Sequence, residues 1–134
     1  LLDASTAMGG GSVVAVQDVA PEETKKYGIV SVDDAARDTS LMHGIVEKPD
    51  PAVAPSRLAV IGRYVFEPAI FKELEQQAPG VGGEIQLTDG IAAMLEHAPC
   101  YSHRFEGTRF DCGSKQGFLD ATVHFARKRG FRIA

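Results

Sequence analysis

Two apolar runs of strand length constrain the fold of this chain most. Residues 13–16 are apolar throughout, and residues 58–66 are interrupted only by Gly62 and Arg63. A strand with one exposed face alternates apolar and polar residues, whereas a strand covered on both faces is apolar nearly throughout. The two runs therefore predict an α/β fold in which both strands are central and helices flank the sheet.

Weaker patterns predict the other elements. Alternating residues 101–105 resemble an edge strand, and a loop is expected at 80–83. Thr88 and Ser114 are residue types that cap helices, so we expect a helix to start at each. Two further strands are expected at 27–32 and 44–48, a helical turn at 21–26, and a helix after Pro68.

Glu47 and Lys48 lie where the strand 44–48 runs into Pro49. A proline disfavours helical backbone in the residue before it, so Lys48 is expected to be extended. Neighbours in an extended chain point to opposite faces, so one side chain would accept hydrogen bonds from hydroxyls while the other binds an anion. The alternative is an ordinary surface Glu and Lys before a turn.

Three places at expected strand boundaries carry chemical groups. These are Gly28, the pair Glu47 and Lys48, and Asp111. Open α/β sheets bind ligands at strand ends, so the three places together suit a sugar phosphate and a metal ion. Two alternatives remain: Gly28 is a bulge, and Asp111 accepts N–H bonds from the turn at Gly113.

Size and charge narrow the classes of function. The chain has 134 residues, which suits one domain, and its net charge of −4 argues against broad nucleic-acid binding. No apolar run reaches membrane-spanning length, so no membrane partner is expected. Cys100 and Cys112 without a secretory signal indicate a reduced, cytoplasmic protein.

Five motifs occur in an order that is typical of one enzyme family. They are K-Y-G-I-V at 26–30, V-E-K-P at 46–49, G-R-Y-V at 62–65, G-E-I-Q-L-T-D at 83–89 and D-C-G-S-K at 111–115. From residue 12 to the last helix, the chain resembles the C-terminal half of the bacterial UTP–glucose-1-phosphate uridylyltransferases. E-I-Q-L-T-D is especially characteristic of this family.

The resemblance implies a fold, a reaction and a role for each site residue. The fold would be the C-terminal part of a Rossmann-like nucleotidyltransferase fold, with a mixed sheet flanked by helices. The family transfers a uridylyl group from UTP to glucose 1-phosphate, which gives UDP-glucose and pyrophosphate, and it uses Mg²⁺. Gly28 and Glu47 would bind the sugar, Lys48 would bind phosphate and act in catalysis, and Asp111 would be one of two carboxylates on the metal.

One part of the family pattern is missing from the sequence. The glycine-rich G-x-G-T-R loop that holds the nucleotide has no match. We therefore expect residues 1–11 to be an N-terminal remnant or linker and residues 12–134 to be the sugar-phosphate-binding half, inactive alone. Strand edges and apolar surface left open by the missing half would make the protein a homo-oligomer.

Two alternatives to this function stay open. One is a related sugar-1-phosphate nucleotidyltransferase that uses another nucleotide or sugar, and the other is a non-catalytic binding or assembly module.

Overall fold

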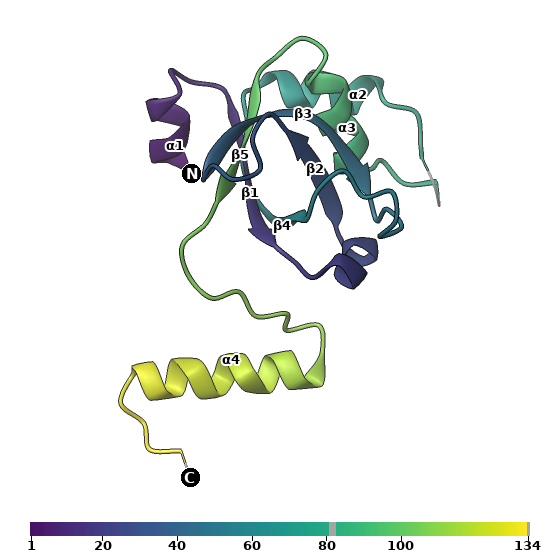
Figure 1. Ribbon diagram of the computed structural model, residues 1–134. Coiled ribbons are helices and arrows are strands. Elements are labelled where there is room, and N and C mark those ends of the chain that lie inside the picture. The colour runs from purple at the N-terminus through teal and green to yellow at the C-terminus, as the bar shows by residue number, and fades with distance from the viewer. Residues whose placement is uncertain (81–82, 134) are drawn as a thin grey trace.

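The computed structural model describes residues 1–80 and 83–133, so residues 81 and 82 of the expected loop 80–83 lie outside the described residues. The chain combines one sheet with helices that are interspersed along the sequence, which agrees with the predicted α/β class (Figure 1). The elements are α1 (Leu2–Ala7), β1 (Ser12–Asp18), the 3₁₀ helix η1 (Pro21–Lys26), β2 (Gly28–Val32), β3 (Thr39–Glu47), β4 (Leu58–Val65), α2 (Ala69–Gln76), α3 (Leu87–Met94), β5 (Cys100–Arg104) and α4 (Lys115–Lys128).

The five strands form a mixed sheet that closes on itself. Their order is β1-β4-β2-β3-β5, and β5 then pairs with β1. The β1–β5 pairing is parallel and the other four pairings are antiparallel. Because β5 pairs on both sides, the prediction of an edge strand at 101–105 was wrong. The described strands leave no open sheet edge, so the prediction that strand edges are left open was also wrong.

The core explains why the first apolar run is continuous. Val13, Val14, Ala15 and Val16 are each at most 1% exposed. Val14 and Val16 pack in a cluster with Ile91 and Met94 of α3, beneath the α2–α3 layer that lies against the barrel (Figure 1). A second, smaller cluster contains Val19, Ile29 and Ala59, with Tyr27 packed against it. In β1, successive residues point to opposite faces and all four are buried, so both faces are covered as the sequence predicted.

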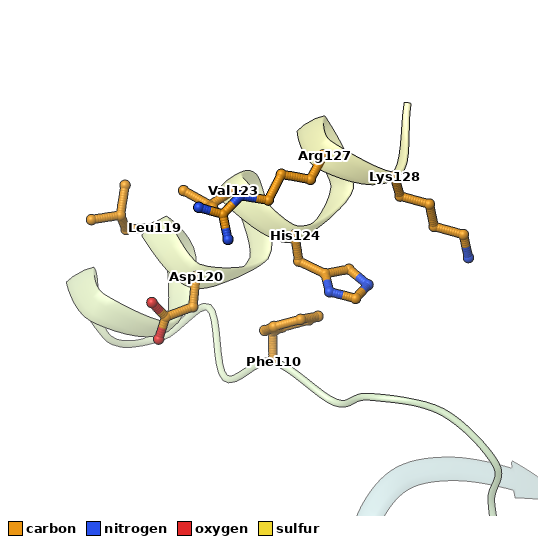
Figure 2. A pocket seen from close by; sticks show the side chains of 7 residues that line it. All are labelled: Phe110, Leu119, Asp120, Val123, His124, Arg127 and Lys128. Atoms are coloured by element: carbon orange, nitrogen blue, oxygen red, sulfur yellow. The ribbon is translucent and has the colours of Figure 1, made fainter. Parts of the chain in front are cut away.

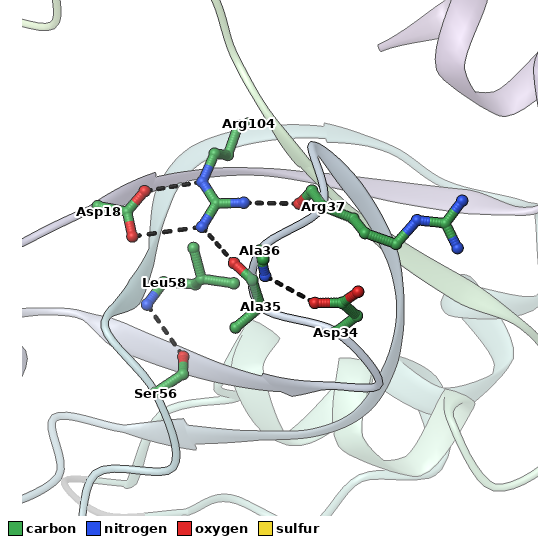
Figure 3. Close-up of polar contacts among 8 residues, drawn as sticks. All are labelled: Asp18, Asp34, Ala35, Ala36, Arg37, Ser56, Leu58 and Arg104. Carbon is green, nitrogen blue, oxygen red and sulfur yellow. Dashed lines mark hydrogen bonds and ion pairs between the residues drawn. The ribbon is translucent and has the colours of Figure 1, made fainter.

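Arg104, at the end of β5, fastens the turn between β2 and β3. Its guanidinium donates to Asp18 Oδ2 at 2.7 Å, to Asp18 Oδ1 at 3.3 Å, and to the carbonyl oxygens of Arg37 and Ala35 (Figure 3). The hydrogen bonds from Arg104 to the Asp18 carboxylate lower the pKa of Asp18 below its ordinary value, and burial only partly opposes this effect. The bidentate geometry is one that lysine cannot reproduce.

The lowered pKa of Asp18 makes folding stability depend on pH. Because the folded pKa lies below the unfolded one, this contribution is complete above the ordinary aspartate pKa and is lost as pH falls through the folded value. We expect urea unfolding midpoints to fall between pH 6 and pH 3, and the fall to be smaller in Asp18→Asn. An equal fall in both proteins would contradict a contribution from Asp18.

The last helix, α4, extends away from the barrel (Figure 1). Ser114 caps it as predicted, accepting a hydrogen bond from the Gly117 N–H at 3.0 Å. Two of its aromatic side chains are exposed, with Phe118 at 63% and Phe125 at 51%. Among the helices that the structure describes, none combines the length and apolar character needed to cross a membrane.

Candidate functional site

Gly28 and Glu47 face each other across two paired strands. Gly28 opens β2, Glu47 ends β3, and the two residues are direct partners in the antiparallel register. A Cβ atom on residue 28 would lie 3.3 Å from Glu47 Oε2. Gly28 therefore leaves the space in front of the Glu47 carboxylate free, which is the close backbone approach that a bound ligand needs. The register shift in this pair falls between Ser31 and Val32, away from Gly28.

Lys48 has a left-handed backbone, with φ of 47°. The prediction of an extended Lys48 on the opposite face from Glu47 was therefore wrong. The Lys48 N–H continues the strand ladder to the Tyr27 carbonyl at 3.0 Å while the chain turns toward Pro49. That turn brings Lys48 Nζ to 3.6 Å from Glu47 Oε1, so the ammonium and the carboxylate lie side by side. Left-handed backbone costs about 1 kcal/mol in a residue with a Cβ.

A pocket of about 300 Å³ lies between the sheet and the start of α3. Gly28 and Glu47 line it from the β2–β3 pair, Tyr64 from β4, and Gln86 and Thr88 from the α3 end. Lys48 is outside this lining and reaches the pocket through its contact with Glu47. With Tyr27, which also lines it, the pocket combines a carboxylate, an amide and three hydroxyls, which are groups that recognise a polyhydroxylated ligand.

Thr88 does not cap α3, so that prediction was wrong. The helix begins after Gln86 and has no side-chain capping bond. Instead, Thr88 Oγ1 donates to Glu47 Oε2 at 2.8 Å. The contact joins residues that are 41 positions apart in the sequence. Sequence reasoning found Thr88 in the E-I-Q-L-T-D motif but could not find its partner.

Sequence reasoning placed Tyr64 in an apolar strand and in the G-R-Y-V motif but did not predict it as a site residue. It is half-buried and stacks on Phe66 with ring centroids 5.0 Å apart. Burial, and next the charge of Glu47, raise the pKa of the Tyr64 phenol above its ordinary value. The phenol therefore stays protonated at neutral pH and can donate a hydrogen bond in the pocket.

Asp111 lies apart from this pocket and is not at a strand end. Residues 108–111 have no regular secondary structure, and Asp111 Oδ1 accepts a hydrogen bond from the Gly113 N–H at 3.0 Å. This is the turn contact that the sequence left open as an alternative. Asp111 lines a second pocket with Arg63 and Arg109. Within residues 1–80 and 83–133, no three His, Cys, Asp or Glu side chains gather as a metal site.

Tyr27 connects the two pockets. It lines the pocket that holds Glu47, and its hydroxyl accepts a hydrogen bond from Arg109 Nη1 at 3.2 Å. The Arg109 guanidinium also lies over the Tyr27 ring, 5.0 Å from its centroid. The structure therefore brings Gly28, Glu47 and Lys48 together. Asp111 lies in a different pocket, which is linked to them through the contact between Arg109 and Tyr27.

A larger hollow, about 680 Å³, lies on α4 and away from these residues. Figure 2 shows Phe110 beneath His124, with Asp120, Arg127 and Lys128 around them. The ring centroids of Phe110 and His124 are 5.1 Å apart. This hollow is formed by one face of α4 together with the Phe110 side chain. None of the predicted site residues lines it. We therefore place the candidate site at the pocket of Glu47.

Comparison with known proteins agrees with the resemblance drawn from the motifs. The model of the nucleotidyl transferase family matches residues 2–128. UTP–glucose-1-phosphate uridylyltransferase of Pseudomonas aeruginosa is 47% identical over 111 residues, which are 83% of this chain and 40% of that protein. The Bacillus subtilis enzyme of the same name is 46% identical over 115 residues, which are 86% and 39%.

Solved structures of UDP-glucose pyrophosphorylases share the fold. An apo structure superposes with a TM-score of 0.89 at 36% identity, over 96% of this chain and 46% of that one. A complex with UDP-glucose has a TM-score of 0.80 at 38% identity, over 88% and 45%. The predicted nucleotidyltransferase fold is thereby confirmed. The chain spans about 40% of the length of the relatives named above.

Proposed function

Because the chain belongs to the nucleotidyl transferase family, we propose that it is the sugar-phosphate-binding part of a UTP–glucose-1-phosphate uridylyltransferase. The whole enzyme transfers a uridylyl group from UTP to glucose 1-phosphate, which gives UDP-glucose and pyrophosphate. One observation carries the proposal: the Glu47 carboxylate faces a pocket beside Gly28, with the Lys48 ammonium 3.6 Å away. The names of the relatives support the choice of nucleotide and sugar.

Each site residue has a role that its chemistry supports. Glu47 accepts hydrogen bonds from sugar hydroxyls, and Gly28 leaves room for the sugar ring against the backbone. Lys48 is more exposed than Glu47, and its ammonium neutralises phosphate charge next to the bound sugar. Phosphoryl transfer depends mainly on positioning and on cations that stabilise the transferring group, so Lys48 is the catalytic residue of this part.

Magnesium remains a proposal, with Asp111 as one ligand. Mg²⁺ in nucleotide enzymes is held by one or two carboxylates together with substrate phosphates and water. Asp111 is exposed and uses Oδ1 for the turn at Gly113, so Oδ2 is suited to a metal ion. When bound, Mg²⁺ would neutralise and orient phosphate oxygens. Arg63 and Arg109 lie in the same pocket and would add positive charge there.

The reaction is tested with the longest protein that the gene encodes and with residues 1–134 alone. We expect the longer protein to release pyrophosphate from UTP and glucose 1-phosphate when Mg²⁺ is present. We expect residues 1–134 alone to release none, because the G-x-G-T-R loop that positions UTP in the family has no match in this sequence. Replacing UTP by dTTP, or glucose 1-phosphate by another sugar 1-phosphate, tests the specificity. An inactive longer protein would contradict the proposed reaction.

Assembly and location are further parts of the proposal. We propose a homo-oligomer, supported by the exposed Phe118 and Phe125 of α4, and light scattering that shows a stable monomer would contradict it. We propose a cytoplasmic location, supported by the free thiols of Cys100 and Cys112. Microscopy of the tagged protein would test the location.

A further inference from the structure

The orientation of the Glu47 carboxylate depends on few contacts. Glu47 is the last residue of β3, so the strand fixes its backbone but not the end of its long side chain. Among residues 1–80 and 83–133, two side chains make polar contacts with the carboxylate: Lys48 at Oε1 and Thr88 at Oε2. The Lys48 contact is 3.6 Å long and comes from a flexible side chain that is 62% exposed. The Thr88 contact is 2.8 Å long and comes from a short, β-branched side chain.

The backbone that carries Thr88 is well anchored. Thr88 lies in the first turn of α3, and Ile91 and Met94 of the same helix are buried in the main core cluster. A hydroxyl on such a support holds its position better than the end of an exposed lysine. The Thr88 hydroxyl carries one donor hydrogen, and it points that hydrogen at Glu47 Oε2.

We propose that Thr88 is a positioning residue, which fixes the Glu47 carboxylate so that it can accept hydrogen bonds from the hydroxyls of a sugar 1-phosphate. This inference rests on the proposed function and deepens it. The Thr88 hydroxyl occupies one lone-pair direction of Oε2, and the remaining directions of the carboxylate are presented to the ligand. An acceptor held in place before binding favours affinity, because its freedom is not lost when the ligand binds.

The first experiment compares Thr88→Val with Thr88→Ser in the longest protein that the gene encodes. Valine keeps the shape of threonine without the hydroxyl, and serine keeps the hydroxyl. We expect Thr88→Val to raise the KM for glucose 1-phosphate about tenfold, the effect of losing a hydrogen bond to a charged group. The KM for UTP should change less than twofold, and Thr88→Ser should stay near wild type. Unchanged binding of glucose 1-phosphate in Thr88→Val would overturn the proposal.

A double mutant separates positioning from direct contact with the sugar. If Thr88 acts through Glu47, Thr88→Val in a Glu47→Ala background should change the KM for glucose 1-phosphate less than twofold further. The same tenfold loss in that background would show that Thr88 acts without Glu47. Equal losses for UTP and for glucose 1-phosphate, with a lower melting temperature, would assign Thr88 a merely structural role. Either result would overturn the proposal.

A readout without catalysis distinguishes this inference from the proposed function. If the wild-type protein transfers no uridylyl group, the proposed function fails, and the position of Glu47 is still measurable. Crystal structures of the two variants should show the Glu47 carboxylate in place in Thr88→Ser and displaced in Thr88→Val. A carboxylate that keeps its position in Thr88→Val would overturn the positioning role whatever the reaction.

Discussion

Replacing Lys48 with alanine is expected to lower turnover of the full-length enzyme tenfold to a hundredfold. A hydrogen bond between an ammonium and a phosphate contributes about 1.5–3 kcal/mol. If that bond is made in the transition state, its loss corresponds to roughly one to two powers of ten in rate. Steady-state rates at saturating UTP and glucose 1-phosphate measure the change. Lys25→Ala, in η1, is the matched control and should keep wild-type turnover.

Glycine at position 48 separates the function of the side chain from the strain of the backbone. Lys48 has φ of 47°, a region that glycine adopts without the steric cost of a Cβ. Lys48→Gly should therefore be as slow as Lys48→Ala, yet more stable than Lys48→Ala by about 1 kcal/mol in urea unfolding. Turnover near wild type in either variant would make Lys48 an ordinary surface residue. Equal stabilities would show that the left-handed backbone carries no strain.

Replacing Gly117 with alanine is expected to lower turnover about a hundredfold. Helix propensity alone favours alanine over glycine by about 1 kcal/mol within α4. Yet a Cβ at this position would lie 2.0 Å from the Asp111 carbonyl oxygen and 2.8 Å from its carbonyl carbon. The backbone of Asp111 must therefore move by about 1 Å or more, and misplacement of a catalytic group by that distance costs about a hundredfold in rate.

The control for Gly117→Ala is another alanine in the same helix. Thr122 is exposed, and its hydroxyl bonds only within α4, to the Phe118 carbonyl oxygen. Thr122→Ala should therefore leave turnover unchanged while slightly favouring the helix. Circular dichroism checks that both variants keep their helices. Wild-type turnover in Gly117→Ala would mean that the position of Asp111 does not matter for the reaction, and the magnesium proposal would then lose its support.

The sequence predicted the strands well because burial determines them. Residues 13–16 are apolar because both faces of β1 are buried there, and that pattern is visible without coordinates. The apolar run 58–66 likewise predicted a strand, although in β4 only Leu58 and Ala59 are fully buried. The pairing of Gly28 with Glu47 was also predictable. Two strands joined by a short connection pair antiparallel, which places the start of the first strand beside the end of the second. The ordered motifs then identified the family that the comparisons confirm.

Features that depend on distant partners were not predictable. The sheet closes because β5 pairs with both β1 and β3. A local sequence pattern does not indicate whether a strand has one neighbour or two. The extended backbone expected at Lys48 followed from Pro49 alone, whereas the hydrogen bond to Tyr27 and the turn that follows decide its conformation. Thr88 was expected to cap its helix because capping is local, whereas its hydrogen bond to Glu47 joins residues that only the fold brings near.

The contact between Tyr27 and Arg109 has a consequence for how the two pockets communicate. The Tyr27 ring belongs to the pocket of Glu47, and the Arg109 guanidinium over it belongs to the pocket of Asp111. A ligand that displaced the ring in the first pocket would also displace the guanidinium in the second, because the two groups are in contact. Such coupling is reciprocal by thermodynamic necessity: whatever one occupant does to the affinity for the other, the other does to it by the same factor. Through the Tyr27 ring, occupancy of either pocket would therefore change the affinity of the other pocket for its ligand.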